Sequence, residues 1–204
     1  MKKFILFVVF LVLIFVGVFY FLPQMTGNKT KSVTGVPKPT ITETGGQESI
    51  TVDGKNVKLE KKYSYEASGI VRTLKWYKGN SFSEKVSPMD IGLIWGSAAQ
   101  YNEVIDYRWF YEGRSVLWTV SCDEEYGDVD LDVVTKETEF GGLIPRDDYV
   151  LSLMKKIKVN DYVKIKGYLV DAYFPTETGS KRSEFSSELD GYHAIFVTDV
   201  EWLD

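Results

Sequence analysis

The hydrophobic pattern of the chain begins with an uninterrupted apolar run near the N-terminus. Phe4–Leu22 contains no charged residue, and Lys2 and Lys3 come directly before it. As a helix rising about 1.5 Å per residue, this run would be about 28 Å long, which matches a hydrocarbon core of roughly 30 Å. Because the lysines lie on its N-terminal side, the pattern predicts a single-pass anchor with the N-terminus in the cytoplasm and the rest of the chain outside.

A cleaved signal peptide is the alternative interpretation of this run. The apolar centre of such a peptide has about 7–15 residues and is followed by small residues at the cleavage site. Here the run is longer, and bulky residues occupy its end, Phe19–Leu22. We therefore expect the segment to be retained as an anchor that holds the chain in the cell membrane.

The hydrophobic pattern changes after the anchor. Pro23–Gln47 is rich in Thr, Gly, Pro and Lys and has few apolar residues, a composition typical of a flexible stalk. Apolar residues recur from there to the end of the chain, over a length sufficient for one domain with its own core. The sequence predicts an anchor at 1–22, a stalk at 23–47 and an extracytoplasmic β-rich domain at 48–204.

Alternating polar and apolar residues predict the first strands of this domain. Asp53-Gly54 separates two alternating segments, Ser49–Val52 and Lys55–Leu59, and such a pair is a strong signal for a hairpin turn. Tyr65–Tyr77 is predicted to form the next strand, with Gly69 at a bulge or a bend.

A second hairpin is predicted for Tyr107–Val120, with its turn at Glu112-Gly113. Tyr107, Trp109 and Tyr111 share one face of its first arm. A sugar platform or an interface patch could be built from such residues. We expect them to fill the core instead, because one face of a strand pair is normally buried.

Two helices are predicted. Ser87-Pro88 resembles a helix start, with a capping serine and a proline at the first helical position, and Gly96 would end this helix. Ala98–Val104 could add a further turn. Pro145–Lys158 is expected to form an amphipathic helix, because apolar residues recur in it at helical spacing; these are Val150, Leu153, Met154 and Ile157.

The remaining segments complete the predicted fold. Cys122–Glu139 is acidic and irregular, Tyr162–Phe174 alternates as a half-buried strand, Pro175–Gly191 is a polar loop, and Tyr192–Trp202 is a last strand. Strand, hairpin, helix, strand and strand is the order of an oligonucleotide/oligosaccharide-binding (OB) barrel. The predicted class is therefore mainly β (α+β), a small OB-like barrel with one amphipathic helix. An open antiparallel α+β sheet is the alternative.

Composition and charge narrow the partners that such a domain could have. The net charge is -5 for the whole chain, and without Lys2 and Lys3 it is -7. A domain this acidic has no overall attraction for nucleic acid or anionic lipid. Cys122 is the single cysteine, which excludes an intrachain disulfide and a zinc site built from cysteines.

Three segments of the domain contain distinctive combinations of residues: SPMDIGLIWG (Ser87–Gly96), GLIPRDDYV (Gly142–Val150) and VNDYVKIKGYLVDA (Val159–Ala172). They resemble the SPxDxxxxWG, NHxIP and KxGDxVxxxGxLV patterns of a family of short, uncharacterised, membrane-anchored bacterial proteins. Gly141-Gly142 replaces the family's Asn-His pair, and Asn160 replaces its glycine. The resemblance implies one domain on one anchor, and it transfers no activity.

The acidic segment contains part of a calcium-loop spacing. Candidate metal ligands are Asp128, Asp130, Asp132 and Glu139. However, Val133 occupies the position where a calcium loop requires glycine. We prefer the interpretation of a solvated acidic loop. A cell-envelope enzyme or a calcium-dependent domain that uses residues 123–139 is retained as the alternative function.

A mixed aromatic and basic face is predicted on the strand Tyr162–Phe174. Tyr162, Lys164, Lys166 and Tyr168 alternate with apolar residues along this strand. On an OB-like barrel such a face could bind a glycan or single-stranded nucleic acid. The acidic chain disfavours nucleic acid, and an ordinary solvated strand face is the simpler interpretation.

The sequence contains no catalytic motif with a convincing spacing. Cys122 and His193, the only histidine, could form a thiol–imidazole pair, but no flanking signature marks the cysteine as a nucleophile. Serine-hydrolase, phosphate-loop and metalloprotease motifs are missing, and no cofactor is predicted. We therefore predict a non-enzymatic binding or assembly module, bound to the membrane through Phe4–Leu22, with a protein or glycan partner in the cell envelope.

Overall fold

The computed structural model describes residues 32–112, 115–122, 129–176, 179–182 and 192–204. The predicted anchor Phe4–Leu22 lies outside these residues. Within the described part of the chain, no helix has both the length and the apolar character needed to cross a membrane.

Five strands pair in a ring-like sheet. They are β3 (Lys55–Trp76), β4 (Met89–Ile94), β7 (Thr138–Pro145), β10 (Tyr192–Trp202) and β8 (Tyr162–Thr176), and each pairs with the next in this order. β8 also pairs with β3, so the order returns to its start. All neighbours are antiparallel except β7 and β10, which are parallel. The fold is mostly β, as predicted, and the β3–β8 pairing distinguishes it from the open sheet considered as the alternative.

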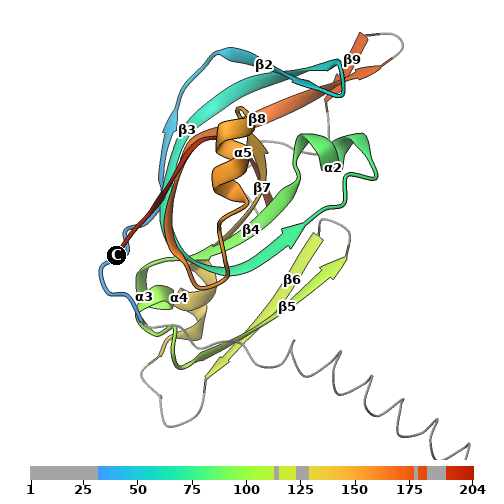
Figure 1. Cartoon of the computed structure of the whole chain (residues 1–204). Coiled ribbons are helices and arrows are strands. Elements are labelled where there is room, and N and C mark those ends of the chain that lie inside the picture. The colour runs from blue at the N-terminus through green and yellow to red at the C-terminus, as the bar shows by residue number, and fades with distance from the viewer. Residues whose placement is uncertain (1–31, 113–114, 123–128, 177–178, 183–191) are drawn as a thin grey trace, which may run out of the picture. The chain divides into compact units, whose positions relative to one another are not determined.

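β3 is long enough to pair with several other strands along its length. One edge of β3 pairs with β8, whereas the other edge is shared by β2 (Gln47–Val52), β1 (Thr40–Glu43) and β4. Its register shifts twice, between Lys61 and Tyr63 and between Val71 and Thr73, and such irregularities bend a strand. Figure 1 shows the resulting curve of β3. The predicted strand Tyr65–Tyr77 is thus the second half of a longer one.

The predicted hairpin turn at Asp53-Gly54 is confirmed. The φ angles of the two residues are 49° and 71°, the left-handed values that a two-residue turn between β2 and β3 requires. The preceding segment, predicted as stalk, contains β1, and Val36 within it is buried with 3% exposure. The described part of the predicted stalk, residues 32–47, therefore belongs to the folded unit.

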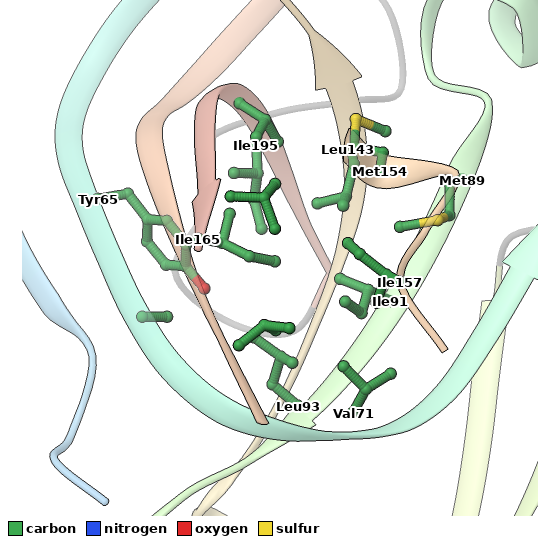
Figure 2. Close-up of a cluster of buried hydrophobic side chains, with 14 of the residues drawn as sticks. Tyr65, Val71, Met89, Ile91, Leu93, Leu143, Met154, Ile157, Ile165 and Ile195 are labelled. Carbon is green, nitrogen blue, oxygen red and sulfur yellow. The ribbon is translucent and has the colours of Figure 1, made fainter. Parts of the chain in front are cut away.

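The main hydrophobic core fills the inside of the ring, as Figure 2 shows. Alternate residues of each strand point inward, and α5 (Asp148–Met154) adds Val150 and Met154 to the same cluster. The inward residues include Tyr65 and Val71 of β3, Ile91 and Leu93 of β4, Leu143 of β7, Ile165 and Leu169 of β8, and Ile195 of β10.

Two further apolar clusters lie on other faces of the strands. One joins α2 (Phe82–Val86) to the outer residues of β3, β7, β8 and β10. The other surrounds α3 (Gly96–Gln100), α4 (Leu131–Lys136) and the hairpin of β5 (Ile105–Glu112) and β6 (Ser115–Cys122), and it includes Tyr107. The predicted second hairpin is confirmed, and Tyr107 belongs to a core as expected.

The predicted helix from Ser87 to Gly96 is wrong. Met89–Ile94 forms β4, and all six of its residues are buried. β4 pairs with β3 on one side and with β7 on the other, so burial on both faces of a central strand outweighs the local capping signal. The nearest short helices are α2, which Ser81 caps, and α3, which begins at Gly96.

Other predicted boundaries also need correction. The amphipathic helix is shorter than Pro145–Lys158, because Pro145 ends β7 and the Asp147 side chain caps α5. The segment predicted as irregular, Cys122–Glu139, contains α4 and the start of β7. The predicted loop after β8 contains β9 (Gly179–Arg182), which pairs with β8. The strands predicted at Tyr162 and at Tyr192 are confirmed as β8 and β10.

Candidate functional site

Aromatic and charged side chains gather on the outer face of the ring where β3 and β4 pair. We call Thr73, Lys75, Tyr77, Asp90 and Tyr111 the outer cluster. Asp90 lies opposite Lys75 in the β3–β4 register, and its neighbours on β4, Met89 and Ile91, point into the ring. Because side chains alternate along a strand, Asp90 faces away from the ring interior.

Hydrogen bonds and ring contacts connect the outer cluster. The Tyr77 hydroxyl donates to the Asp90 carboxylate, and the hydroxyls of Thr73 and Tyr111 lie 2.5 Å apart. The Lys75 ammonium lies 5.0 Å from the centre of the Tyr77 ring and 4.8 Å from that of Tyr111, within cation–π range. The cluster thus holds one cation between two aromatic rings.

Burial keeps the Tyr111 phenol neutral and makes a charged carboxylate at Asp90 unfavourable. Desolvation raises the pKa of Tyr111 to about 12, although the hydrogen bond with Thr73 opposes this rise, so the phenol stays neutral at physiological pH. Asp90 has only 1% exposure. A buried carboxylate is tolerated only when it is hydrogen-bonded or paired, and here the Tyr77 hydroxyl meets part of that need.

The outer cluster also joins the β5–β6 hairpin to the ring. Tyr111 belongs to β5, whereas Thr73 belongs to β3. Sequence reasoning missed the cluster because it placed Asp90 in a helix. The alternation of Thr73, Lys75 and Tyr77 with Leu74 and Trp76 was the available signal, since it predicts one shared face.

The predicted calcium ligands lie in different surroundings. Asp130 caps α4, and its carboxylate accepts hydrogen bonds from the backbone N–H groups of Asp132 and Val133 at 3.0 and 3.2 Å. Glu139 is on β7 with its side chain largely buried, and Asp128 lies outside the described residues. Within the described part of the chain, no three His, Cys, Asp or Glu side chains are placed to hold a metal ion.

The predicted aromatic and basic face of β8 is built largely of paired charges. Lys164 lies 3.1 Å from Glu66 and Lys166 lies 2.5 Å from Glu201. The hydrogen bond with Glu201 raises the pKa of Lys166, and the same bond lowers the pKa of Glu201. An anionic ligand would have to compete with these glutamates.

The two tyrosines of that face pack in different places. Tyr162 lies against the cluster around α3, whereas Tyr168 lies against the cluster that contains α2. The Lys61 ammonium is 4.2 Å from the centre of the Tyr168 ring. The four predicted residues share a strand, and the two rings do not form one platform.

The predicted thiol–imidazole pair is not resolved by the structure. Only the backbone of Cys122 is described, where it pairs with Ile105. The imidazole of His193 is buried on β10, and its Nε2 lies 3.7 Å from Oε1 of Glu139. The sequence analysis had assigned His193 to a thiol–imidazole pair and Glu139 to a calcium site, so it did not predict that these two side chains are neighbours.

Comparison of the chain with protein-family models, curated proteins and solved structures finds no match. The resemblance to the membrane-anchored bacterial family therefore stays a prediction. Two of the segments that carry the resemblance are neighbours in the sheet, because Asp90 on β4 pairs with Gly142 on β7. Gly142 is one of the two glycines that replace the family's Asn-His pair.

Proposed function

We propose that the described domain is an OB-like barrel that serves as a non-enzymatic binding or assembly module, held outside the cell membrane by Phe4–Leu22. The order of pairing is the observation that carries this proposal. β3, β4, β7, β10 and β8 pair in turn and return to β3, and α5 lies between β7 and β8 in the sequence. This is the connectivity of a five-stranded OB barrel with its helix between the third and fourth strands.

The proposed binding surface follows from this correspondence. In OB barrels, ligands bind across the second and third strands and the adjoining loops, which correspond here to β4 and β7. The outer cluster lies beside these strands and contributes two tyrosine rings, a lysine and a buried carboxylate. Aromatic rings and polar groups at one place suit a polyhydroxylated ligand, so we propose an envelope glycan as the ligand.

The β8 face is the weaker candidate for the same role. Both of its lysines have glutamate partners, and exchanging a formed ion pair for a ligand contact yields little free energy. The acidic chain also argues against nucleic acid as the partner. A neutral or weakly charged ligand on the outer cluster fits these two observations together.

Binding of soluble oligosaccharides by the full chain in detergent micelles tests the ligand. We expect Lys75→Ala and Tyr111→Ala each to weaken binding at least tenfold, because each removes a side chain of the outer cluster. Lys166→Ala on β8 is the matched control and should bind as the wild type does. Equal affinity in all variants, or no binding by a panel of neutral and acidic oligosaccharides, would contradict the proposed surface.

The location of the protein needs its own test. Intact-mass measurement of the chain extracted from membranes should include Phe4–Leu22, since we propose an uncleaved anchor. Protease added to intact cells with a permeable outer layer should remove the domain. A mature chain that begins after Leu22, or a domain protected from external protease, would contradict the proposed location.

A further inference from the structure

Three ionisable side chains meet inside the ring, on a different face of the strands from the outer cluster. Glu139 comes from β7, His193 from β10 and Tyr65 from β3. Oε1 of Glu139 and Nε2 of His193 are 3.7 Å apart, and their side chains have 12% and 7% exposure. We call these three residues the inner cluster.

The strand register explains how these residues come together. β7 and β10 are parallel, and His193 lies opposite Gly141, which is two residues after Glu139 and therefore on the same face. A side chain at Gly141 would meet the Ile195 side chain at 2.5 Å and the His193 carbonyl oxygen at 3.1 Å. The glycine thus lets β7 approach β10 closely beside the imidazole.

Two polar atoms of the inner cluster are not satisfied by the described residues. The Tyr65 hydroxyl and Oε1 of Glu139 are fully buried and make no hydrogen bond of ordinary geometry with them. Tyr65 has 3% exposure, and Figure 2 shows its ring directed into the ring of strands. An unsatisfied buried polar atom is costly, and a buried carboxylate without compensation is more so.

Among the residues that the structure describes around Glu139, His193 is the neighbour that can balance its charge. On β4 the residue opposite Glu139 is the apolar Leu93, and from β3 it faces the neutral phenol of Tyr65. Asp171, the buried carboxylate of β8, lies 3.8 Å from Lys62. Burial raises the pKa of Glu139, against smaller opposing effects of His193 and of Tyr65.

One proton removes the uncompensated charge, on whichever of the two groups it resides. A neutral carboxylic acid beside a neutral imidazole carries no net charge, and neither does a carboxylate beside an imidazolium. We propose that Glu139, His193 and Tyr65 form a proton-binding site inside the ring, and that a proton bound there stabilises the packing of β3, β7 and β10. This inference goes beyond the proposed function, since it concerns the interior rather than the outer cluster.

The sign of the pH effect follows from the direction of the shift. The pKa of Glu139 in the folded chain lies above its value of 4.5 in the unfolded chain, so the folded state holds more protons in this window. Stability must then fall as the pH rises from about 4.5 through the folded pKa.

Thermal unfolding of the full chain in detergent, followed from pH 4.5 to pH 8, tests the proposal. We expect the wild-type Tm to fall by roughly 3–8 °C as the pH rises through the raised pKa of Glu139, and Glu139→Gln to remove most of this fall because the amide cannot ionise. Glu201→Gln, a surface glutamate paired with Lys166, should keep the wild-type fall. An equal fall in wild type and Glu139→Gln would overturn the proposal.

A second measurement distinguishes proton binding from a merely structural role. His193 is the only histidine, so its imidazole signals can be followed by NMR without ambiguity. We expect the wild-type imidazole signals to change in a step as Glu139, 3.7 Å away, ionises above pH 4.5, and Glu139→Gln to remove that step because the amide cannot ionise. A step that persists in Glu139→Gln would contradict the site.

The variant Tyr65→Phe keeps the proposal testable if Glu139→Gln does not fold. Its ring preserves the packing, and it removes a hydroxyl that lowers the pKa of Glu139. The pH at which stability declines should therefore move upward. If that pH does not move, the Tyr65 hydroxyl is not part of the site and the proposal fails.

Discussion

The inner and outer faces of β8 satisfy their side chains in different ways. Inward, Ile165 and Leu169 have no exposure and contact the core of the ring. Outward, Lys164 and Lys166 are half-buried and each is paired with a glutamate. Burying one aliphatic side chain contributes about 1.5–3 kcal/mol, whereas a surface ion pair contributes little. The difference indicates that stability is concentrated inside the ring, which leaves the outer face free to change.

The inner cluster is an exception to this pattern, because it places ionisable side chains inside the ring. Glu139 and His193 lie on inward positions of β7 and β10, beside the apolar side chains of the main hydrophobic core. Placing a carboxylate there lowers stability at neutral pH, because its pKa is raised by burial. A protein that retains such a group in its core often uses it.

Truncation of an inward side chain should have the largest effect. We expect Ile165→Ala to lower the free energy of unfolding by about 2–5 kcal/mol, because it leaves a cavity in a fully packed core. Urea unfolding of the full chain in detergent measures this loss. A loss below about 1 kcal/mol would show that the ring interior is not the main source of stability.

A substitution at the inward glycine of β8 should come next. A Cβ at Gly167 would lie 2.0 Å from the Phe196 carbonyl oxygen, so Gly167→Ala must push β8 away from β10. We expect a loss of roughly 1–3 kcal/mol in urea unfolding. Gly45→Ala is the control, since a Cβ there meets nothing within 4 Å. Equal stability of the two variants would contradict the close approach of the strands.

Loss of the α5 cap should have a smaller, pH-dependent effect. The Asp147 carboxylate accepts a hydrogen bond from the Val150 N–H at 2.9 Å, and this bond and Arg146 lower the pKa of Asp147. Its contribution is therefore present above pH 3.8, its unfolded value, and is lost as the pH falls through the lower folded pKa. Asp147→Ala should lower the Tm by a few degrees at pH 6 and have no effect at strongly acidic pH.

The matched control for the cap is Asp148→Ala. Asp148 is the first residue of α5, and the cap bond to Val150 is made by Asp147. Its removal should change the Tm less than Asp147→Ala does at pH 6. Similar changes in both variants would mean that general charge near the helix, rather than the cap, supports α5.

Removal of an outward charge should have the smallest effect. Lys166→Ala breaks the ion pair with Glu201 on the outward face, where both side chains are partly exposed and where solvent and salt weaken the attraction. We expect a Tm equal to that of the wild type within error, and a double-mutant cycle with Glu201→Ala should give a coupling close to zero. A clear fall in Tm would place part of the stability on the outer face and weaken the comparison.

Prediction from the sequence succeeded where neighbouring residues decide the outcome. Asp53-Gly54 formed the expected turn because both residues adopt positive φ angles readily. The alternation in Tyr162–Phe174 indicated β8 and its inward residues, since side chains alternate along any strand. At Ser87-Pro88 the same kind of local signal failed, because β4 is buried between two partners.

The candidate sites were harder to predict from the sequence, because they depend on contacts between distant residues. The outer cluster needs Tyr111 of β5 beside Thr73 of β3. The alternation along β3 indicated one half of this contact and nothing indicated the other. Lys164 and Lys166 were predicted on one face correctly, but their glutamate partners come from β3 and β10, and those partners decide whether the charges are available.

The sequence by itself determined the apolar run at Phe4–Leu22, the turn at Asp53-Gly54 and the alternation of most strands, because these depend on residues close together in the chain. The tertiary structure decided that Met89–Ile94 is a strand and that β3 pairs with β8 to complete the ring. It also brought Tyr65 and His193 to Glu139. Burial and charge compensation depend on contacts between distant residues, and no local pattern specifies which residues will meet.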